Sequence, residues 1–246
     1  MAYQSFGTQI TALTGISLTG ATNQGYVDSF LTNAARDVLC MIPAQHLVEH
    51  SLATTLNASS TTLGTIDDKI ILGVLRKYSQ NSTTSEVGRF RECRQVSFGE
   101  IGIAEDDSGY MESYSSEDPV FYMYNNTLYV LPKPDNTYTA SVVYVGYPTV
   151  LYSETAIADF PKQLEQAVIY RAAADSARFL FQDEQDEDVY VPMIKDLTNQ
   201  FSNSIKLFLT KYQQPTPVKE DTTASTNTLQ KMLLKVQVQV SLKKVQ

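Results

Sequence analysis

Two segments decide the fold of this chain: FPKQLEQAVIYRAAADSARFLF (Phe160–Phe181) and VPMIKDLTNQFSNSIKLFLT (Val191–Thr210). Pro161 stands where the first turn of a helix tolerates proline, and the alanines at 172–174 would let another helix approach closely. Apolar residues recur at helical spacing, at Leu164, Ala167, Val168, Ala174 and Phe181 in the first segment and at Ile194, Leu197, Phe201, Ile205 and Phe208 in the second. We therefore predict an antiparallel helix pair between Phe160 and Thr210.

The stretch that joins these helices is acidic. Residues 182–188 contain five carboxylates and no basic residue: Asp183, Glu184, Asp186, Glu187 and Asp188. This composition favours an exposed turn.

A third helix is predicted near the N-terminus. Apolar residues from Tyr26 to Ile42 recur at helical spacing, Asn23 offers a cap, and Pro43 ends the pattern. We expect this helix to pack against the later pair.

Between these helices the sequence predicts β-structure. After a polar, extended connector at 51–63, residues 66–78 indicate a strand. Two apolar runs, 120–124 and 127–131, flank Asn125-Asn126 as in a two-residue hairpin, and 137–146 gives a third strand. Together they predict an antiparallel meander.

The expected fold class is therefore α+β. A helical bundle would be formed by the N-terminal helix and the C-terminal helix pair, with the meander inserted and an extended C-terminal tail. The corresponding boundaries are 1–50 for the first bundle segment, 51–150 for the β-region, 151–212 for the helix pair and 213–246 for the tail.

The tail differs from the rest of the chain. Pro215 and Pro217 break the helix, and a linker rich in Thr and Ser follows. Residues 229–246 carry four lysines and no acid, a net charge of +4, whereas the remaining chain carries 15 basic and 27 acidic residues, or −12. The alternating VQVQVSL stretch predicts a strand added to another sheet, with Val236, Val238, Val240, Leu242, Lys231 and Lys235 as contact residues. Pairing with the chain's own sheet is the alternative.

Composition argues against several functional classes. The net charge of −8 disfavours nucleic acid as the main partner of the exposed surface. Cys40 and Cys93 suit a reducing compartment, and neither a membrane span nor a signal peptide is expected. Neither a Ser/His/Asp arrangement in a suitable context nor a glycine-rich phosphate loop is found, so we expect no enzyme activity and no cofactor.

One motif allows an alternative interpretation of the chain as a zinc peptidase. His46-Leu-Val-Glu49-His50 matches an inverted zinc-peptidase signature, in which two histidines four residues apart would share a helix face. A third ligand is needed, and the downstream sequence offers no obvious one. An end of a surface helix is the favoured interpretation.

The order of the elements resembles the neck adaptor proteins of tailed bacteriophages, also called head-to-tail connector or head completion proteins. The resemblance rests on NAARDVL (Asn33–Leu39), YMYNNTLYVLPKP (Tyr122–Pro134), the Tyr147-Pro148 exit, and the Phe160–Leu164 stretch leading into 167–174. It covers most of residues 26–212.

This resemblance implies a structural virion protein made in the host cytoplasm. It would form a ring of twelve copies in the neck, dock on the portal, and meet the next neck or tail protein. DNA would pass through its lumen during ejection without specific binding, and no membrane is involved. The helices would form the ring wall, with the acidic turn toward a neighbour or the lumen. Another virion component, such as a tail terminator or a fibre-attachment protein, is the alternative.

Overall fold

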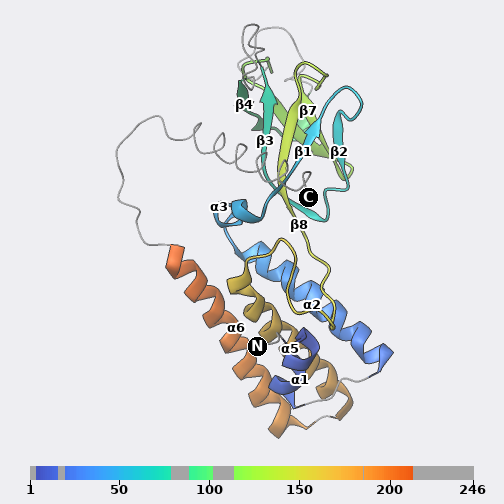
Figure 1. The fold of residues 1–246 in the computed structure, drawn as a ribbon, viewed down its shortest axis with the longest axis vertical. Coiled ribbons are helices and arrows are strands. Elements are labelled where there is room, and N and C mark those ends of the chain that lie inside the picture. Colours follow the sequence, from blue (N-terminus) through green and yellow to red (C-terminus); the bar gives the residue numbers. More distant parts are fainter. Residues whose placement is uncertain (1–3, 16–19, 79–88, 102–113, 185, 213–246) are drawn as a thin grey trace. The chain divides into compact units, whose positions relative to one another are not determined.

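The computed structural model describes residues 4–15, 20–78, 89–101, 114–184 and 186–212 (Figure 1). These residues fall into two compact units. Among the described residues, one unit is helical and is built from the chain up to His50 and from Tyr147 to Tyr212, while the other contains the strands between Ser51 and Gly146. The α+β fold class is confirmed.

The helical unit is organised around one central helix. Its elements are α1 (Phe6–Thr14), α2 (Ala21–Met41), α3 (Ala44–Leu47), η1 (Val48–His50), η3 (Lys162–Leu164), α5 (Glu165–Glu184) and α6 (Glu187–Tyr212). Helix α5 packs against α1, α2 and α6 (Figure 1). Its alanines at 172–174 and 177 are buried, which explains why three helices can surround it.

The predicted apolar stripe of the second helix is confirmed in α6. Leu197, Phe201, Ile205 and Phe208 are buried along one side of the helix. Pro192 is the sixth residue of α6 and has no N–H to donate to the preceding turn, so one helical hydrogen bond is missing there.

The exposed turn predicted at 182–188 is shorter in the structure. Helix α5 continues through Glu184 and α6 already begins at Glu187, so the acidic stretch belongs mainly to helix ends. Glu187 and Asp188 occupy the first turn of α6, where the partial positive charge of a helix N-terminus favours carboxylates.

Helix α1 has a standard cap at each end, whereas the N-terminus of α2 differs from the prediction. Ser5 caps α1 by accepting a hydrogen bond from the Thr8 N–H, and Gly15 ends it with φ 71°. Helix α2 begins earlier than predicted, because Gly20 and not Asn23 is its N-cap residue.

The second unit contains two four-stranded sheets. The first has the order β1-β8-β3-β4, with β1 (Leu52–Leu56), β3 (Lys69–Lys77), β4 (Phe90–Glu92) and β8 (Ala140–Gly146). The second has the order β2-β7-β6-β5, with β2 (Thr62–Gly64), β5 (Arg94–Gln95), β6 (Val120–Tyr124) and β7 (Thr127–Leu131). A short helix, η2 (Phe98–Glu100), follows β5.

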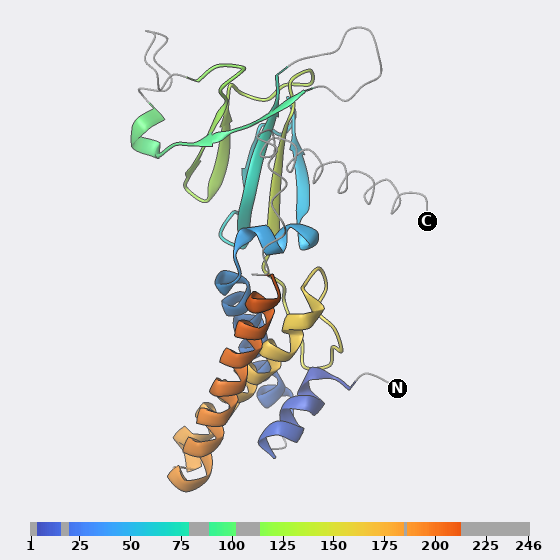
Figure 2. The same cartoon turned by 90° about the vertical axis from the view of Figure 1, so that its left-hand side faces the viewer.

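Side chains from both sheets form one core. Its buried members are Leu56, Val74, Cys93, Phe121, Leu128, Val130, Ala140 and Val142. Figure 2 shows the green β6–β7 hairpin apart from the strands of the other sheet, so the two sheets form separate layers. Arg76 is buried on β3 and donates from Nε to the Pro132 carbonyl at 2.7 Å, which ties β3 to the segment after β7.

The hairpin prediction is confirmed. Strands β6 and β7 pair antiparallel, with Tyr124 opposite Thr127. Asn125 and Asn126 have φ angles of 47° and 56°, as a two-residue turn between twisted strands requires.

The prediction of a meander is wrong at its third strand. Strand β8 does not pair with β7 but lies in the other sheet, between β1 and β3. The link of residues 132–139 is long enough to cross between the sheets. The apolar run of Val142, Val143 and Val145 suits a central strand better than the alternation of a hairpin edge.

The polar connector at 51–63 is extended, but it forms β1 and β2. These strands pair through the backbone with β8 and β7, respectively. The threonines of these strands and the polar residues between them gave no strong apolar signal. The C-terminal segment 213–246, including the predicted added strand, lies outside the described residues.

Candidate functional site

A polar stripe on α2 holds the segment that follows β8. Asp28, Thr32, Arg36 and Cys40 are spaced four residues apart and therefore share one face of the helix. The Thr32 hydroxyl donates to the Val150 carbonyl at 3.3 Å and accepts from the Val150 N–H at 3.1 Å. Asp28 accepts a short hydrogen bond from the Tyr152 N–H. The stripe thus satisfies backbone groups of an extended segment that has few hydrogen bonds of its own.

Tyr147 meets the other end of this stripe. The Arg36 guanidinium lies 4.7 Å from the centre of the Tyr147 ring. The Tyr147 hydroxyl lies 3.3 Å from the Cys40 sulfur. The hydrogen bond with Cys40, together with partial burial, raises the pKa of Tyr147 to about 12. The phenol is therefore protonated near neutral pH and acts as a hydrogen-bonding group.

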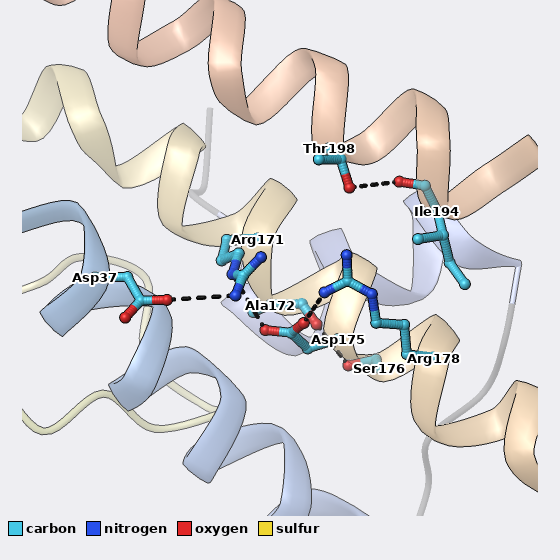
Figure 3. A network of polar contacts seen from close by, with 8 residues as sticks. All are labelled: Asp37, Arg171, Ala172, Asp175, Ser176, Arg178, Ile194 and Thr198. Carbon is cyan, nitrogen blue, oxygen red and sulfur yellow. Dashed lines mark hydrogen bonds and ion pairs between the residues drawn. The ribbon is translucent and has the colours of Figure 1, made fainter. Parts of the chain in front are cut away.

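A charged network joins α2 to α5 (Figure 3). Arg171 on α5 lies 3.4 Å from Asp37 on α2 and 3.4 Å from Asp175 on its own helix. Arg178 lies 2.6 Å from the other oxygen of Asp175. Asp175 therefore lies between two cations, each about one turn away along α5, and Arg171 connects this cluster to Asp37 on α2.

The His46–His50 motif does not adopt the single helical turn that a zinc site would require. His46 lies in α3, whereas Glu49 and His50 lie in η1. The His46 ring packs edge-on against Phe208, with 6.3 Å between ring centres. Burial lowers the pKa of His50, although Glu49 and Asp159 act in the opposite direction.

Among the described residues, no three side chains of His, Cys, Asp or Glu lie close enough together to hold a metal ion. A search of the same residues for a helix with the length and hydropathy of a membrane span finds none.

An aromatic cluster covers one face of the β2-β7-β6-β5 sheet. Tyr122 and Tyr129 are cross-strand partners whose rings stack at 4.9 Å. Phe98 on η2 stacks on Tyr124 at 4.2 Å, and both side chains are about half exposed, at 55% and 50%. Exposed aromatic side chains of this kind are enriched in protein–protein contacts, so this face is a candidate interaction surface.

The comparison with protein families identifies the chain. The family model described as SU10 adaptor protein matches residues 1–225. The chain belongs to this family. SU10 adaptor proteins are phage head-tail adaptors, so the resemblance to neck adaptors is confirmed and the chain is a structural component of the virion. A search of curated proteins found no match to it.

The family match includes both structural units and the start of the tail. It ends before the alternating segment at 236–242, so the role of that segment has to be argued from this chain alone. Its six predicted contact residues lie outside the described part of the structure.

The five acidic residues predicted to face a neighbour or a lumen lie at the ends of α5 and α6 and in the connection between them. The side chains of Asp186, Glu187 and Asp188 are exposed. Asp183 and Glu184 belong to the last turn of α5. Whether these carboxylates face a neighbour or a lumen stays a prediction.

Sequence reasoning missed the stripe on α2 and the aromatic cluster. The spacing of Asp28, Thr32, Arg36 and Cys40 at intervals of four residues could have indicated the stripe, although the sequence does not name its partners. The alternation of Tyr122 and Tyr124 along β6 could have indicated that both tyrosines lie on one face.

Proposed function

We propose that this SU10 adaptor protein assembles into a closed ring of twelve copies in the phage neck, between portal and tail. The ring would dock on the portal, offer a surface to the next neck or tail protein, and surround the path of DNA during ejection. The family match over residues 1–225 is the observation that carries this proposal.

The surface of the helical unit supports an assembly role. Large apolar side chains are exposed at Tyr26, Met41, Leu151, Val189, Val191 and Leu207. Leu207 on α6 is 73% exposed, and a leucine in that environment gains about 1.5–3 kcal/mol when a partner covers it completely. We propose that α6 contributes to the contact between neighbouring copies.

The charge of the chain supports passage of DNA without binding. The net charge of −8 and the exposed carboxylates of Asp186, Glu187 and Asp188 would repel a phosphate backbone. We propose that these carboxylates face either the lumen or a neighbouring copy, and that the protein works by assembly and not by catalysis. It would be synthesised in the host cytoplasm before it joins the virion.

The tail supports links between copies. Val236, Val238, Val240 and Leu242 would lie on one side of an added strand, while Lys231 and Lys235 bring positive charge to an otherwise acidic chain. We propose that these residues contact another subunit.

The test is a pair of single substitutions on α6. Leu207→Asp should weaken ring formation on the portal, seen by negative-stain microscopy, because it places a charge in the proposed contact. Asn199→Asp adds the same charge at an exposed position two turns earlier and about 80° around the helix, and is the matched control. Equal ring formation by both variants would show that α6 does not contribute to the contact between copies. Rings of a symmetry other than twelve-fold would favour a tail terminator.

A further inference from the structure

The segment formed by β4 and β5 crosses from one sheet to the other. Strand β4 pairs with β3 at Leu75–Lys77, whereas β5 pairs with β6 at Val120 and Phe121. Cys93 between them is buried in the shared core. This segment therefore covers only part of the edge of each sheet.

Within the described residues, two strand edges have no strand partner beyond this crossing segment. In the described part of the chain, β3 from Lys69 to Gly73 has a strand partner only on its β8 side. Likewise, β6 from Tyr122 to Tyr124 has a described strand partner only on its β7 side. Five residues of β3 span roughly 16 Å, which is long enough to pair with a short added strand.

A pocket of about 500 Å³ lies between these two edges. Ile71, Leu72 and Val74 of β3 line it on one side, and Phe121 and Met123 of β6 line it on the other. Phe121 and Met123 are two residues apart and so point to the same face of β6. Cys93 and the polar residues Glu92, Arg94 and Gln95 of the crossing segment complete the lining. The walls formed by β3 and β6 can accept apolar side chains from a strand that pairs with β3.

The ligand that fits this arrangement is an extended segment that alternates apolar and polar residues. Its backbone would complete the hydrogen bonds of β3, alternate side chains would enter the pocket, and the others would face water. The chain contains such a segment at Val236–Leu242, with valines at 236, 238 and 240.

The tail has the length to reach a neighbouring molecule. Residues 213–235, 23 in all, separate the end of α6 from this segment. A linker of this length spans at most roughly 75–80 Å when extended.

We propose that the edge of β3 at Lys69–Gly73, with the adjoining pocket, binds the Val236–Leu242 segment of a neighbouring copy. This proposal rests on the ring described above. In a closed ring each copy donates one tail and accepts one, so no edge is left open.

Charge favours the neighbour as the source of the tail. Apart from residues 229–246, each copy carries −12, so adjacent copies repel each other. A +4 segment held at the contact between two copies lies between two acidic bodies and reduces this repulsion, whereas a tail folded back away from the contact does not. The net charge of each copy is −8 in both cases.

Disulfide crosslinking between two populations tests the proposal. One population carries Leu72→Cys and lacks residues 229–246, and the other carries Val238→Cys and keeps Leu72. Both carry Cys40→Ser and Cys93→Ala, because Cys93 itself lines the pocket. The two are mixed with portal, oxidised, and separated without reductant, while native mass reports the oligomer.

The expected product is a covalent dimer with one chain of each kind. Gln237→Cys in place of Val238→Cys is the matched control and should crosslink several-fold less, because its side chain points to the opposite face of the strand. A third sample joins Leu72→Cys and Val238→Cys in one chain.

Each other outcome overturns the proposal. Internally linked monomers from the third sample, without dimers from the mixture, would show that the tail pairs with its own sheet. Rings without crosslinks would show that the tail does not bind this edge, while the proposed ring would still be supported. Absence of any oligomer together with absence of crosslinks would reject the ring and the docking site alike.

Discussion

The guanidinium of Arg171 on α5 lies 3.4 Å from the carboxylate of Asp37 on α2. The Asp37 side chain is 46% exposed, so water screens the pair, and we expect a coupling energy of about 0.2–1 kcal/mol. A double-mutant cycle with Asp37→Asn and Arg171→Gln, followed by urea unfolding, measures it. The matched cycle of Asp37→Asn with Arg178→Gln should give almost no direct coupling, because Arg178 contacts Asp175 instead. Equal coupling in both cycles would contradict the assignment.

Gly7 permits the close approach of Tyr152 to α1. A β-carbon at this position would lie 2.0 Å from a ring atom of Tyr152, and the Gly7 N–H donates to the Tyr152 carbonyl. We expect Gly7→Ala to lower the free energy of unfolding by about 1–3 kcal/mol. Gly25→Ala on α2 is the control, since nothing lies within 4 Å of its β-carbon, and it should raise stability by up to about 1 kcal/mol. Similar destabilisation by both substitutions would contradict the contact.

The two cysteines should differ in reactivity. Cys93 is buried in the core of the sheet unit, and burial raises its pKa to about 12, so its thiol stays protonated at pH 7–8. Cys40 is exposed. We expect iodoacetamide to label Cys40 first in the native protein and Cys93 only after unfolding, as peptide mass spectrometry would show. Rapid native labelling of Cys93 would contradict the burial of this residue.

His50 should make stability depend on pH. Because burial lowers the pKa of His50 in the folded state below the ordinary 6.5, the unfolded chain binds a proton more readily. As pH falls below 6.5, the wild type should lose more stability than His50→Gln, and the difference should level off below the folded-state pKa. Urea unfolding of both proteins at several pH values tests this. The same pH dependence of the free energy of unfolding in the wild type and in His50→Gln would contradict this prediction.

Much of the fold was predictable because periodicity and turn chemistry are local properties. The stripe from Leu197 to Phe208 identified α6, and Asn125-Asn126 identified the hairpin. These features depend on neighbouring residues alone, so a single sequence contains the information.

The sheet topology was not predictable in the same way. Whether β8 pairs with β7 or with β3 depends on contacts between distant residues, and the succession of the two strands along the chain suggested that they pair with each other. Strand β1 was missed because backbone pairing with β8 defines it, whereas its own side chains include only one buried residue, Leu56.

The candidate interaction surfaces were harder to predict than the fold. Tyr122 and Tyr129 are seven residues apart in sequence and stack only because the register of the hairpin brings them opposite each other. The stripe on α2 required knowledge of Tyr147, Val150 and Tyr152, which follow it by more than 100 residues.

Native mass spectrometry of the intact protein, alone and mixed with its portal, tests the central claim most directly. The proposed function predicts a closed oligomer of twelve copies on the portal. A protein that stays monomeric and does not bind the portal would contradict it.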